Sequence, residues 1–358
     1  MASFEMKTVG LTYDLKTDYE FKKDDPPDAN AEFDHPSTIE VIASAIEACG
    51  FKAKKIGNAS SLLEKIDSLN VDIVFNISEG LSGRNRESQV PILLEMAGIP
   101  FVGADALTLS LTLDKIMAKK IFIAEGIPTP KFFEVRTLDA LLNVDHFRFP
   151  LIVKPRFEGS SKGLSDASRV ENTEELKKQT EYIINAYKQP ALVEEFIRGE
   201  EFTAAIVGND PPEVMPVVQV KIDGRLKLND KFYTFARIQS DRLEYICPAR
   251  INQDLKKKLS ELALKTYDVV ECRDFGRVDF RVDNEGNVYV LEINPLPSLS
   301  TEDVFMLVAK AVGISYEEII GKILNSALKR YNLSEDITYG AKRTSPFAKA
   351  SGDSPPKL

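Results

Sequence analysis

Short apolar runs alternate with helical patterns through the first hundred residues, and this order restricts the possible folds more than any other feature of the chain. The sequence predicts strands at 8–13, 51–56, 72–77 and 100–102, with helices between them at 36–50, 60–69 and 86–97. The first helix has the clearest pattern, because its apolar residues recur three and four positions apart, at Ile39, Ile42, Ala43 and Ile46. Strands that alternate with helices at this spacing indicate βαβ units and therefore a parallel sheet.

The pattern changes near residue 112, which divides the chain into three predicted units. A helix at 113–124 is followed by a boundary sequence, Gly-Ile-Pro-Thr-Pro, and by a small α+β unit with a helix at 173–187 and strands at 150–155, 191–197 and 202–207. The region from 213 to about 331 begins with strands and continues with a helix at 253–270, a hairpin at 276–294 and two closing helices. We therefore expect an α/β multidomain fold with units at 1–112, 113–208 and 209–333, followed by a disordered tail at 334–358.

The composition limits the chemistry that the chain can perform. There are 46 Lys and Arg against 55 Asp and Glu, and the resulting net charge of −9 makes the chain a poor partner for nucleic acid or anionic lipid. No run approaches the ~20 apolar residues of a membrane span, and the first residues do not form a signal peptide, so a cytoplasmic protein is expected. With only two histidines and three widely spaced cysteines, catalysis must rely mainly on carboxylates, Lys, Arg and backbone groups.

The segment 276–294 carries the strongest functional signal. It has two alternating strands around an Asp-Asn-Glu-Gly turn, which predicts a β-hairpin. Arg277 and Asp279 then share one face, as do Glu292 and Asn294, and folding the hairpin brings the two pairs together. Such a face is either an oxygen-rich site for Mg²⁺, which prefers hard ligands and accompanies phosphates, or a solvated surface with an ion pair.

Two further segments are polar in unusual places. Lys154 closes an apolar strand, where its ammonium group must be solvated or paired. The sequence Glu-Gly-Ser-Ser-Lys-Gly at 158–163 can present backbone N–H groups and hydroxyls to an anion, or it is simply a turn. The acidic residues at 194–195 and 200–201 flank two strands and, taken alone, are solvated surface residues.

Taken together, these motifs resemble the ATP-grasp superfamily and, within it, the D-alanine–D-alanine ligase group. The resemblance runs from about residue 37 to residue 330, and its motifs occur in the same order: Leu-Asp-Lys at 113–115, Val-Lys-Pro at 153–155, Glu-Gly-Ser-Ser at 158–161, Val-Glu-Glu at 193–195, Gly-Glu-Glu-Phe-Thr at 199–203, Gly-Arg-Val-Asp at 276–279 and Leu-Glu-Ile-Asn-Pro at 291–295. Each motif is weak alone, but seven in register are a specific signal. The resemblance implies an ATP-grasp fold behind an N-terminal parallel-sheet domain, and it also implies a homodimer.

The resemblance assigns a nucleotide and a metal to the site. ATP would lie between the central and C-terminal units, with the Gly/Ser loop closed over its phosphates and the adenine near Glu194. Glu201 would hold the ribose. The implied ATP-binding residues are Lys115, Lys154, Glu158, Ser160, Ser161, Glu194, Glu195, Ile197, Glu201 and Lys231. The implied ligands of Mg²⁺, normally two ions with Mn²⁺ as a substitute, are Asp279, Glu292 and Asn294.

The reaction implied by the resemblance is amide formation between a small-molecule carboxylate and an amine. The carboxylate attacks the γ-phosphorus of ATP, and the amine then displaces phosphate from the acyl phosphate through a tetrahedral oxyanion. Mg²⁺ and lysines would neutralise the crowded negative charge, and closure of the Gly/Ser loop would exclude water. The implied catalytic residues are Arg277, which would stabilise the oxyanion, Ser160 and Lys231.

The segments that decide substrate specificity depart from the family pattern. Where the family has His-Gly and Gly-Glu-Asp-Gly, residues 76–87 read Asn-Ile-Ser-Glu-Gly-Leu-Ser-Gly-Arg-Asn-Arg-Glu, so the histidine is missing and two arginines have entered. The early Glu-His-Glu-Val-Ser segment is replaced by Glu-Phe-Asp-His-Pro-Ser at 32–37, and the tyrosine of the substrate loop comes one residue late. The substrate residues implied by these positions are Glu32, Asp34, Glu79, Arg84, Tyr233, Ser298 and Asp303.

Asp303 is the change with the clearest consequence. It falls where the family offers a serine to the carboxylate of the acceptor, and two facing carboxylates repel unless one is protonated or bridged. One hypothesis is that the acceptor carries an amine, amide or basic group there, instead of the free carboxylate of a simple α-amino acid. The alternative is that the loop shifts by one residue and Asp303 points to water.

Three functions therefore stay open. The first is a ligase whose substrates are related to, but different from, a pair of D-alanines. The second is an authentic D-alanine–D-alanine ligase of cell-wall precursor synthesis. The third is a nucleotide-binding module or a carboxylate kinase without ligase turnover, and the complete set of Asp279, Glu292 and Asn294 argues against it.

Overall fold

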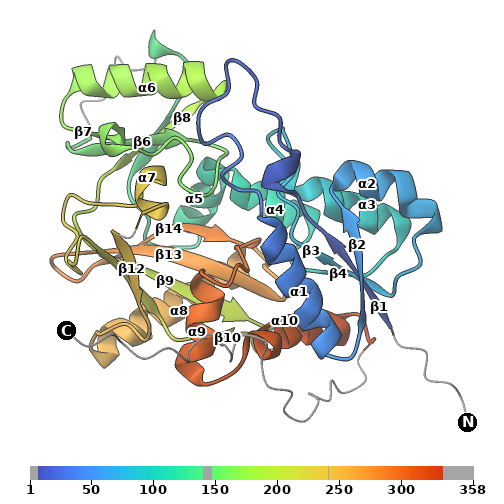
Figure 1. Ribbon diagram of the computed structural model, residues 1–358. Helices are drawn as coiled ribbons and strands as arrows, with labels where there is room; N and C mark the ends of the chain where they lie inside the picture. Colours follow the sequence, from blue (N-terminus) through green and yellow to red (C-terminus); the bar gives the residue numbers. More distant parts are fainter. Residues whose placement is uncertain (1–6, 140–146, 241, 334–358) are drawn as a thin grey trace, which may run out of the picture.

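The computed structural model describes residues 7–139, 147–240 and 242–333. These residues form three sheets with helices packed against each of them (Figure 1). The predicted disordered tail at 334–358 lies outside the described residues.

The first sheet is parallel, as the βαβ pattern predicts, with the strand order β2-β1-β3-β4. Its strands are β1 (Thr8–Thr12), β2 (Lys52–Gly57), β3 (Ile73–Asn76) and β4 (Phe101–Val102). One face is covered by α1 (Pro36–Ala48), and the other by α2 (Ala59–Lys65) and α3 (Gln89–Ala97). The predicted apolar stripe of α1 is confirmed, because Ile39, Ile42 and Ile46 are at most 3% exposed.

The helix predicted at 113–124 is confirmed as α5 (Lys115–Ala124), which begins two residues later than expected, and a separate helix that was not predicted, α4 (Ala106–Leu113), precedes it. They are separated at Asp114, whose ψ of 87° is not helical. The Asp114 side chain accepts a hydrogen bond from the backbone N–H of Met117 and so caps α5, which an apolar pattern alone does not reveal. This break places Lys115 in the first turn of α5.

The second sheet has the order β5-β8-β6-β7 and is covered by α6 (Thr173–Tyr187), which lies at the top of Figure 1. Its strands are β5 (Phe132–Val135), β6 (Leu151–Pro155), β7 (Arg169–Val170) and β8 (Ala191–Glu195). Helix α6 has the predicted bounds. Asn172 fixes its start, because the Asn172 side chain accepts a hydrogen bond from the backbone N–H of Glu175.

The third sheet has the order β12-β11-β9-β13-β14, with β10 beside β9. Its strands are β9 (Gly199–Val207), β10 (Glu213–Val214), β11 (Val218–Ile222), β12 (Leu243–Ile246), β13 (Phe275–Asp283) and β14 (Val288–Asn294). Strand β9 pairs with β13 along its whole length and so belongs here, although the sequence groups it with β8. The expected boundary at 208 therefore leaves β9 in the central unit, although β9 forms its hydrogen bonds in the C-terminal sheet.

The remaining α-helices follow β11 in the sequence. They are α7 (Phe235–Ile238), α8 (Gln253–Val269), α9 (Val304–Val312) and α10 (Tyr316–Arg330). Helices α9 and α10 share one buried core with β1, β3, β9 and α1. In this core the ring of Phe275 lies 6.3 Å from that of Phe75 and 6.0 Å from that of Phe305, centroid to centroid. This packing fixes the N-terminal sheet against the C-terminal sheet.

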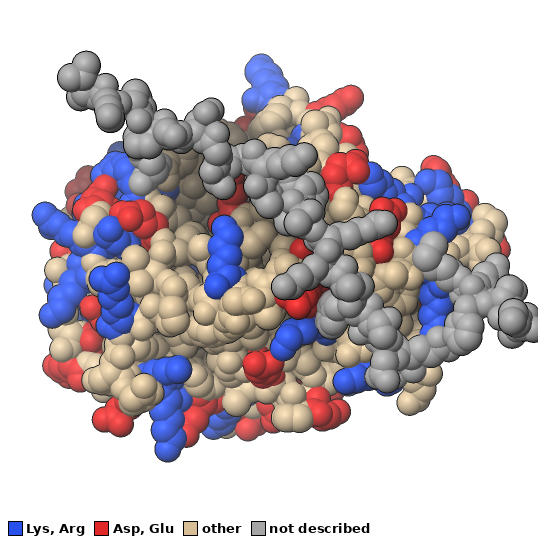
Figure 2. Space-filling model, turned by 60° about the horizontal axis from the view of Figure 1, so that its bottom comes forward, with Lys and Arg blue, Asp and Glu red and all other residues tan. Residues whose placement is uncertain are grey.

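The surface carries charges of both signs. On the face shown in Figure 2, Lys and Arg side chains are mixed with Asp and Glu side chains. Among the described residues, no helix combines the length and the apolar character needed to cross a bilayer.

Candidate functional site

A cavity of about 760 Å³ lies between β6 and β8 of the second sheet and β13 and β14 of the third. Loops from the N-terminal unit and the segment before α9 complete its walls. This volume is in the range of small-molecule sites, roughly 300–1,000 Å³. The lining contains every site residue expected from the sequence except Arg84 and Lys231.

Arg84 and Lys231 lie outside the lining because nearby carboxylates hold their side chains elsewhere. Arg84 pairs with Asp114 at 2.8 Å and its side chain is 62% exposed. Lys231 pairs with Asp223. The neighbouring Tyr233 does line the cavity, and burial raises the pKa of its hydroxyl well above the usual value. Of the two residues expected from this loop, Tyr233 therefore lines the cavity and Lys231 does not.

The hairpin of β13 and β14 pairs Arg277 with Asn294 and Asp279 with Glu292, which confirms the predicted arrangement. The pairing depends on a β-bulge, because Leu291 is an extra residue in β14. Without that extra residue Glu292 would point to the opposite face of the sheet, since a shift of one position reverses the direction of every side chain. The bulge thus brings the second acidic side chain to the cavity.

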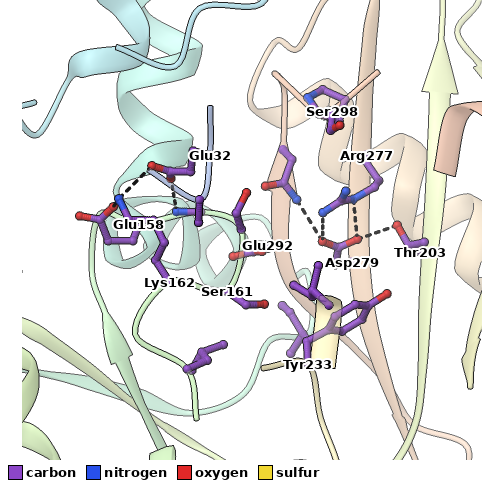
Figure 3. Close-up of a pocket in the computed structure, with 18 of the residues that line it drawn as sticks. Glu32, Glu158, Ser161, Lys162, Thr203, Tyr233, Arg277, Asp279, Glu292 and Ser298 are labelled. Atoms are coloured by element: carbon purple, nitrogen blue, oxygen red, sulfur yellow. Dashed lines mark hydrogen bonds and ion pairs between the residues drawn. The ribbon is translucent and has the colours of Figure 1, made fainter. Parts of the chain in front are cut away.

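Asp279 is held by four hydrogen bonds (Figure 3). Arg277 donates to both carboxylate oxygens, from Nε to Oδ1 at 3.0 Å and from Nη2 to Oδ2 at 2.9 Å. The hydroxyl of Thr203 donates to Oδ1 at 2.6 Å, and the amide of Asn294 donates to Oδ2 at 3.0 Å. Burial lowers the pKa of Arg277, but Asp279 and Asp303 outweigh burial and hold it above its usual value, so the guanidinium is charged.

Glu292 forms an ion pair with Lys115 at 2.6 Å. Burial raises the pKa of this carboxyl, but Lys115 and Lys154 outweigh burial and bring the pKa of Glu292 to about 2. The side chain is therefore a carboxylate at neutral pH. Figure 3 shows Glu292 between the group around Glu32 on one wall of the cavity and Asp279 on the other.

Lys119 does not line the cavity itself, but it pairs with the lining residue Glu194, and no sequence motif identifies it. Its Nζ and that of Lys154 each lie 2.5 Å from a carboxylate oxygen of Glu194, and all three side chains are at most 10% exposed. Burial lowers the pKa of Lys119 to about 8 in spite of Glu194. The signal in the sequence was its spacing, because Lys119 lies three residues before Phe122 on the buried face of α5.

The residues expected to bind adenine and ribose line the cavity at the end of β8 and along β9. Glu201 is buried and paired with Arg281 at 2.8 Å. Arg281 also donates to the backbone carbonyl of Ile197 at 3.0 Å, so it fixes the turn that follows Glu195. The backbone of this turn is thereby held in a defined position beside the cavity.

Glu32 ties the N-terminal unit to the Gly/Ser loop. Its carboxylate lies 2.7 Å from Arg86 and 3.2 Å from Lys162, and it accepts a hydrogen bond from the backbone N–H of Gly159 at 2.5 Å. Lys162 also contacts Glu158 at 2.5 Å. Burial raises the pKa of Glu32, but Arg86 and Lys162 outweigh burial and bring it to about 2. These contacts hold the loop against the cavity.

Ser160 and Ser161 form the part of this loop that lines the cavity. Their φ values of 47° and 55° lie in the left-handed region, which non-glycine residues adopt at a cost. The ion pairs of Glu32 with Arg86 and Lys162 support this conformation. The loop offers hydroxyl and N–H donors of the kind that phosphate oxygens accept.

Glu79 and Glu87 bring two more carboxyl groups to Glu32. Carboxylate oxygens of the three residues lie within 4.8 Å of one another, and all three residues line the cavity. Burial and the charges of Glu87 and Glu32 raise the pKa of Glu79 well above its usual value, and burial raises the pKa of Glu87 to about 7. Glu87 was not identified from the sequence, because one acid in a polar loop has no distinguishing pattern.

Asp303 and Ser298 line the cavity from the segment before α9. Asp303 accepts a hydrogen bond from the backbone N–H of Val304 at 2.6 Å, and its Oδ1 lies 3.9 Å from Nη1 of Arg277. Asp34 lies in the same lining, and burial raises its pKa to about 7, with Asp303 adding to the shift. The lining of the cavity therefore contains the acidic side chains of Asp34 and Asp303 together with Arg277.

The chemistry of the donor set fits a magnesium ion beside a triphosphate. Asp279 and Glu292 supply carboxylate oxygens and Asn294 supplies a carboxamide oxygen, which are the hard ligands that Mg²⁺ prefers. In the protein alone, Arg277 and Lys115 place positive charge against these acids. A bound cation can take over that neutralising role.

Comparison with known proteins identifies a family that the chain resembles. The family model described as "D-ala D-ala ligase C-terminus" matches residues 121–325. The chain is 35% identical over 301 residues to an uncharacterized protein, y4sG, of Sinorhizobium fredii, which covers 81% of this chain and 87% of the relative. It is 36% identical over 301 residues to a D-alanine–D-alanine ligase of Carboxydothermus hydrogenoformans, which covers 82% of this chain and 93% of the relative.

A solved structure supports the fold. The crystal structure of a D-alanine–D-alanine ligase from Bacillus anthracis complexed with ATP superposes with a TM-score of 0.70 at 22% identity, covering 92% of this chain and 99% of that one. The family match spans more than half of the chain, and the resemblance inferred from the seven motifs is confirmed. The chain therefore belongs to the D-alanine–D-alanine ligase family of ATP-grasp proteins, whose members are ATP-dependent carbon–nitrogen ligases.

Proposed function

We propose that the protein joins a small carboxylate to an amine through an acyl phosphate, and that its acceptor is not a simple α-amino acid. One observation carries the proposal: a single cavity gathers Asp279 and Glu292, which suit a metal ion, with Lys115, Lys154 and Arg277, which suit phosphate and a developing oxyanion. The family membership supports an ATP-dependent ligase reaction at this site.

ATP enters the proposed reaction as a substrate. Lys115 and Lys154 would contact its phosphate oxygens, and Glu194 holds Lys154 in position through their ion pair at 2.5 Å. Ser160 and Ser161 would cover the phosphates. Adenine would lie against the backbone near Glu195 and Ile197 and the ribose near Glu201, where Arg281 keeps the turn in place.

Asp279, Glu292 and Asn294 would hold magnesium. When bound, the ion supplies positive charge that neutralises the triphosphate and the charge that develops during phosphoryl transfer. Binding of the ion requires Arg277 and Lys115 to give up part of their contact with the two acids.

In the first proposed step an oxygen of the substrate carboxylate attacks the γ-phosphorus, and the bond to ADP breaks. In the second step the amine nitrogen attacks the acyl carbon, the bond to the phosphate oxygen breaks, and the nitrogen loses a proton. Arg277 would donate hydrogen bonds to the oxyanion between these events, an effect of about 10²–10³ in rate at comparable sites. The closed loop at Ser160 would keep water from the acyl phosphate.

The acidity around Arg277 supports the altered acceptor. Asp303 lies 3.9 Å from the guanidinium and lines the cavity, so an acceptor carboxylate bound there would meet a second negative charge. An acceptor with an amine, amide or basic group avoids this repulsion. The second candidate acceptor is D-alanine itself, which is favoured by the name of the Carboxydothermus relative.

An assay of ADP release tests the proposal. The full chain is incubated with Mg²⁺, ATP, a panel of carboxylates and a panel of amines, and products are identified by mass spectrometry, with Asp279→Ala as the blank. ADP formation that requires both a carboxylate and an amine is the expected result. D-alanine as the best acceptor would contradict the altered specificity. Stoichiometric acyl phosphate without an amine would indicate a carboxylate kinase instead.

A further inference from the structure

We infer that Lys119 is a positioning residue for ATP, because its ammonium group neutralises Glu194 and so leaves Lys154 free to contact a phosphate oxygen. The inference rests on the proposed function, in which Lys154 binds the phosphates of ATP. It adds a residue that touches neither substrate. Loss of this residue should weaken the binding of ATP more than it slows the reaction of bound ATP.

A single carboxylate holds both lysines. Nζ of Lys119 lies 2.5 Å from Oε1 of Glu194, and Nζ of Lys154 lies 2.5 Å from Oε2. The side chains of Lys119 and Glu194 are each 1% exposed, and that of Lys154 is 10% exposed. Burial raises the pKa of Glu194, but the two lysines outweigh burial and hold this pKa below its usual value. Glu194 is therefore a buried carboxylate with two cationic partners.

The two lysines differ in what they can reach. Lys154 lines the cavity, whereas Lys119 lies behind Glu194 and does not. Lys119 donates a hydrogen bond to the hydroxyl of Thr129 at 2.7 Å, and this hydroxyl donates to the backbone carbonyl of Val290 at 2.8 Å. Neither Thr129 nor Val290 lines the cavity, so a ligand there does not displace these contacts. Lys119 is thus the fixed partner of Glu194, and Lys154 is the partner that can turn to a phosphate.

The burial of Glu194 explains why one lysine is not enough. A phosphate oxygen attracts Lys154 and weakens its contact with Glu194. If Lys154 were the only partner, this movement would leave a buried carboxylate without a counter-charge, which is strongly unfavourable. Burial lowers the pKa of Lys119 to about 8, which is still above neutral pH, so the ammonium group is mainly charged at pH 7. Lys119 can therefore neutralise Glu194 while Lys154 binds ATP.

Calorimetric titration of the full chain with Mg²⁺ and a non-hydrolysable ATP analogue tests this inference. Lys119→Met should bind the analogue about tenfold or more weakly than the wild type. Lys120→Met, which removes the exposed neighbouring lysine of the same helix, is the matched control and should stay within about twofold of the wild type. In the assay of ADP formation, Lys119→Met should raise KM for ATP about tenfold and change kcat less than threefold.

The double variant with Lys119→Met and Glu194→Gln is decisive. Glutamine carries no charge for Lys154 to neutralise, while its amide oxygen can still accept a hydrogen bond. The double variant should therefore bind the analogue about fivefold or more tightly than Lys119→Met alone. A role of Lys119 in packing alone predicts the opposite order, because a second change in the same buried cluster would weaken binding further.

Several results would overturn the inference. These are an unchanged affinity in Lys119→Met, a double variant that binds no more tightly than Lys119→Met, or no binding of the analogue by the wild type. Thermal unfolding of Lys119→Met provides a further check, because the remaining pair of Glu194 and Lys154 is neutral and the variant should fold. A variant that does not fold would show that Lys119 serves the fold instead. The proposed function fails separately, if the variants show the expected affinities while no pair of carboxylate and amine supports ADP formation.

Discussion

Arg277 and Asp279 lie two residues apart on one face of β13 and form a two-point contact, with Nε–Oδ1 and Nη2–Oδ2 distances of 3.0 and 2.9 Å. Asp279 is a proposed metal ligand, and Arg277 is the proposed donor to the oxyanion. The contact therefore couples the two roles. We expect a cation at Asp279 to release the guanidinium for the reacting carboxyl group.

Replacing Arg277 by Lys should lower kcat about 10²–10³-fold, as removal of one oxyanion donor does elsewhere. Lysine keeps the positive charge but cannot make the two-point contact. Affinity for the nucleotide should change much less, because Lys115 and Lys154 are intact. Steady-state kinetics and nucleotide titration measure the two effects. A kcat close to the wild-type value would argue against a direct role for Arg277.

Replacing Asp303 by Ser should improve D-alanine as an acceptor. Relief of the repulsion between carboxylates should raise kcat/KM for D-alanine about tenfold, which corresponds to ~1.4 kcal/mol. Serine also caps helices well, so α9 should stay intact. The control is Asp268→Ser, which removes an exposed charge on α8. An acceptor preference that does not change would mean that Asp303 does not face the acceptor.

Replacing Glu87 by Gln should stabilise the protein at neutral pH. The pKa of Glu87 is raised from 4.5 to about 7 by burial, so the folded state binds more protons than the unfolded state between these values. Stability of the wild type should therefore fall as the pH rises from about 4.5 to 7, and the variant should lack this loss. Above pH 7 the free energy of unfolding of the variant should exceed that of the wild type by an amount that approaches about 3 kcal/mol, because each unit of pKa shift corresponds to about 1.36 kcal/mol. Urea unfolding at pH 4 and pH 7.5 measures it, and a less stable variant at pH 7.5 would be contrary evidence.

Replacing Glu194 by Gln should destabilise the fold by about 3–5 kcal/mol, because Lys119 and Lys154 would remain buried without their counter-charge. Lys119→Met should destabilise the fold less than Glu194→Gln, because the ion pair between Glu194 and Lys154 remains and the apolar side chain of methionine suits the buried position. Urea unfolding of both variants gives the comparison. Equal stabilities would show that the three charges do not depend on one another.

The sequence predicts local features better than register and sheet membership. The apolar stripe of α1, the bounds of α6 and the facing pairs of the hairpin followed from spacing, because each depends on neighbours in the chain. The bulge at Leu291 did not, since one extra residue is visible only when two strands are paired. The same limit explains why β9 was grouped with the wrong sheet.

The residues of the site show the same distinction between features that depend on the local sequence and features that depend on distant partners. Those inside motifs, such as Lys154 and Asp279, were found by their pattern and do line the cavity. Arg84 and Lys231 were expected there but are held by acids that motif counting does not consider. Lys119 was missed because a lysine on an otherwise apolar helix face looks like a solvated residue until its buried partner Glu194 is known.

The central claim is that a carboxyl oxygen of the substrate takes the terminal phosphoryl group of ATP. The most direct test is complete turnover with a substrate whose two carboxylate oxygens are both fully labelled with a heavy oxygen isotope, followed by mass spectrometry of the released phosphate. The account predicts one labelled oxygen in every phosphate formed. Unlabelled phosphate released together with the amide product would contradict it.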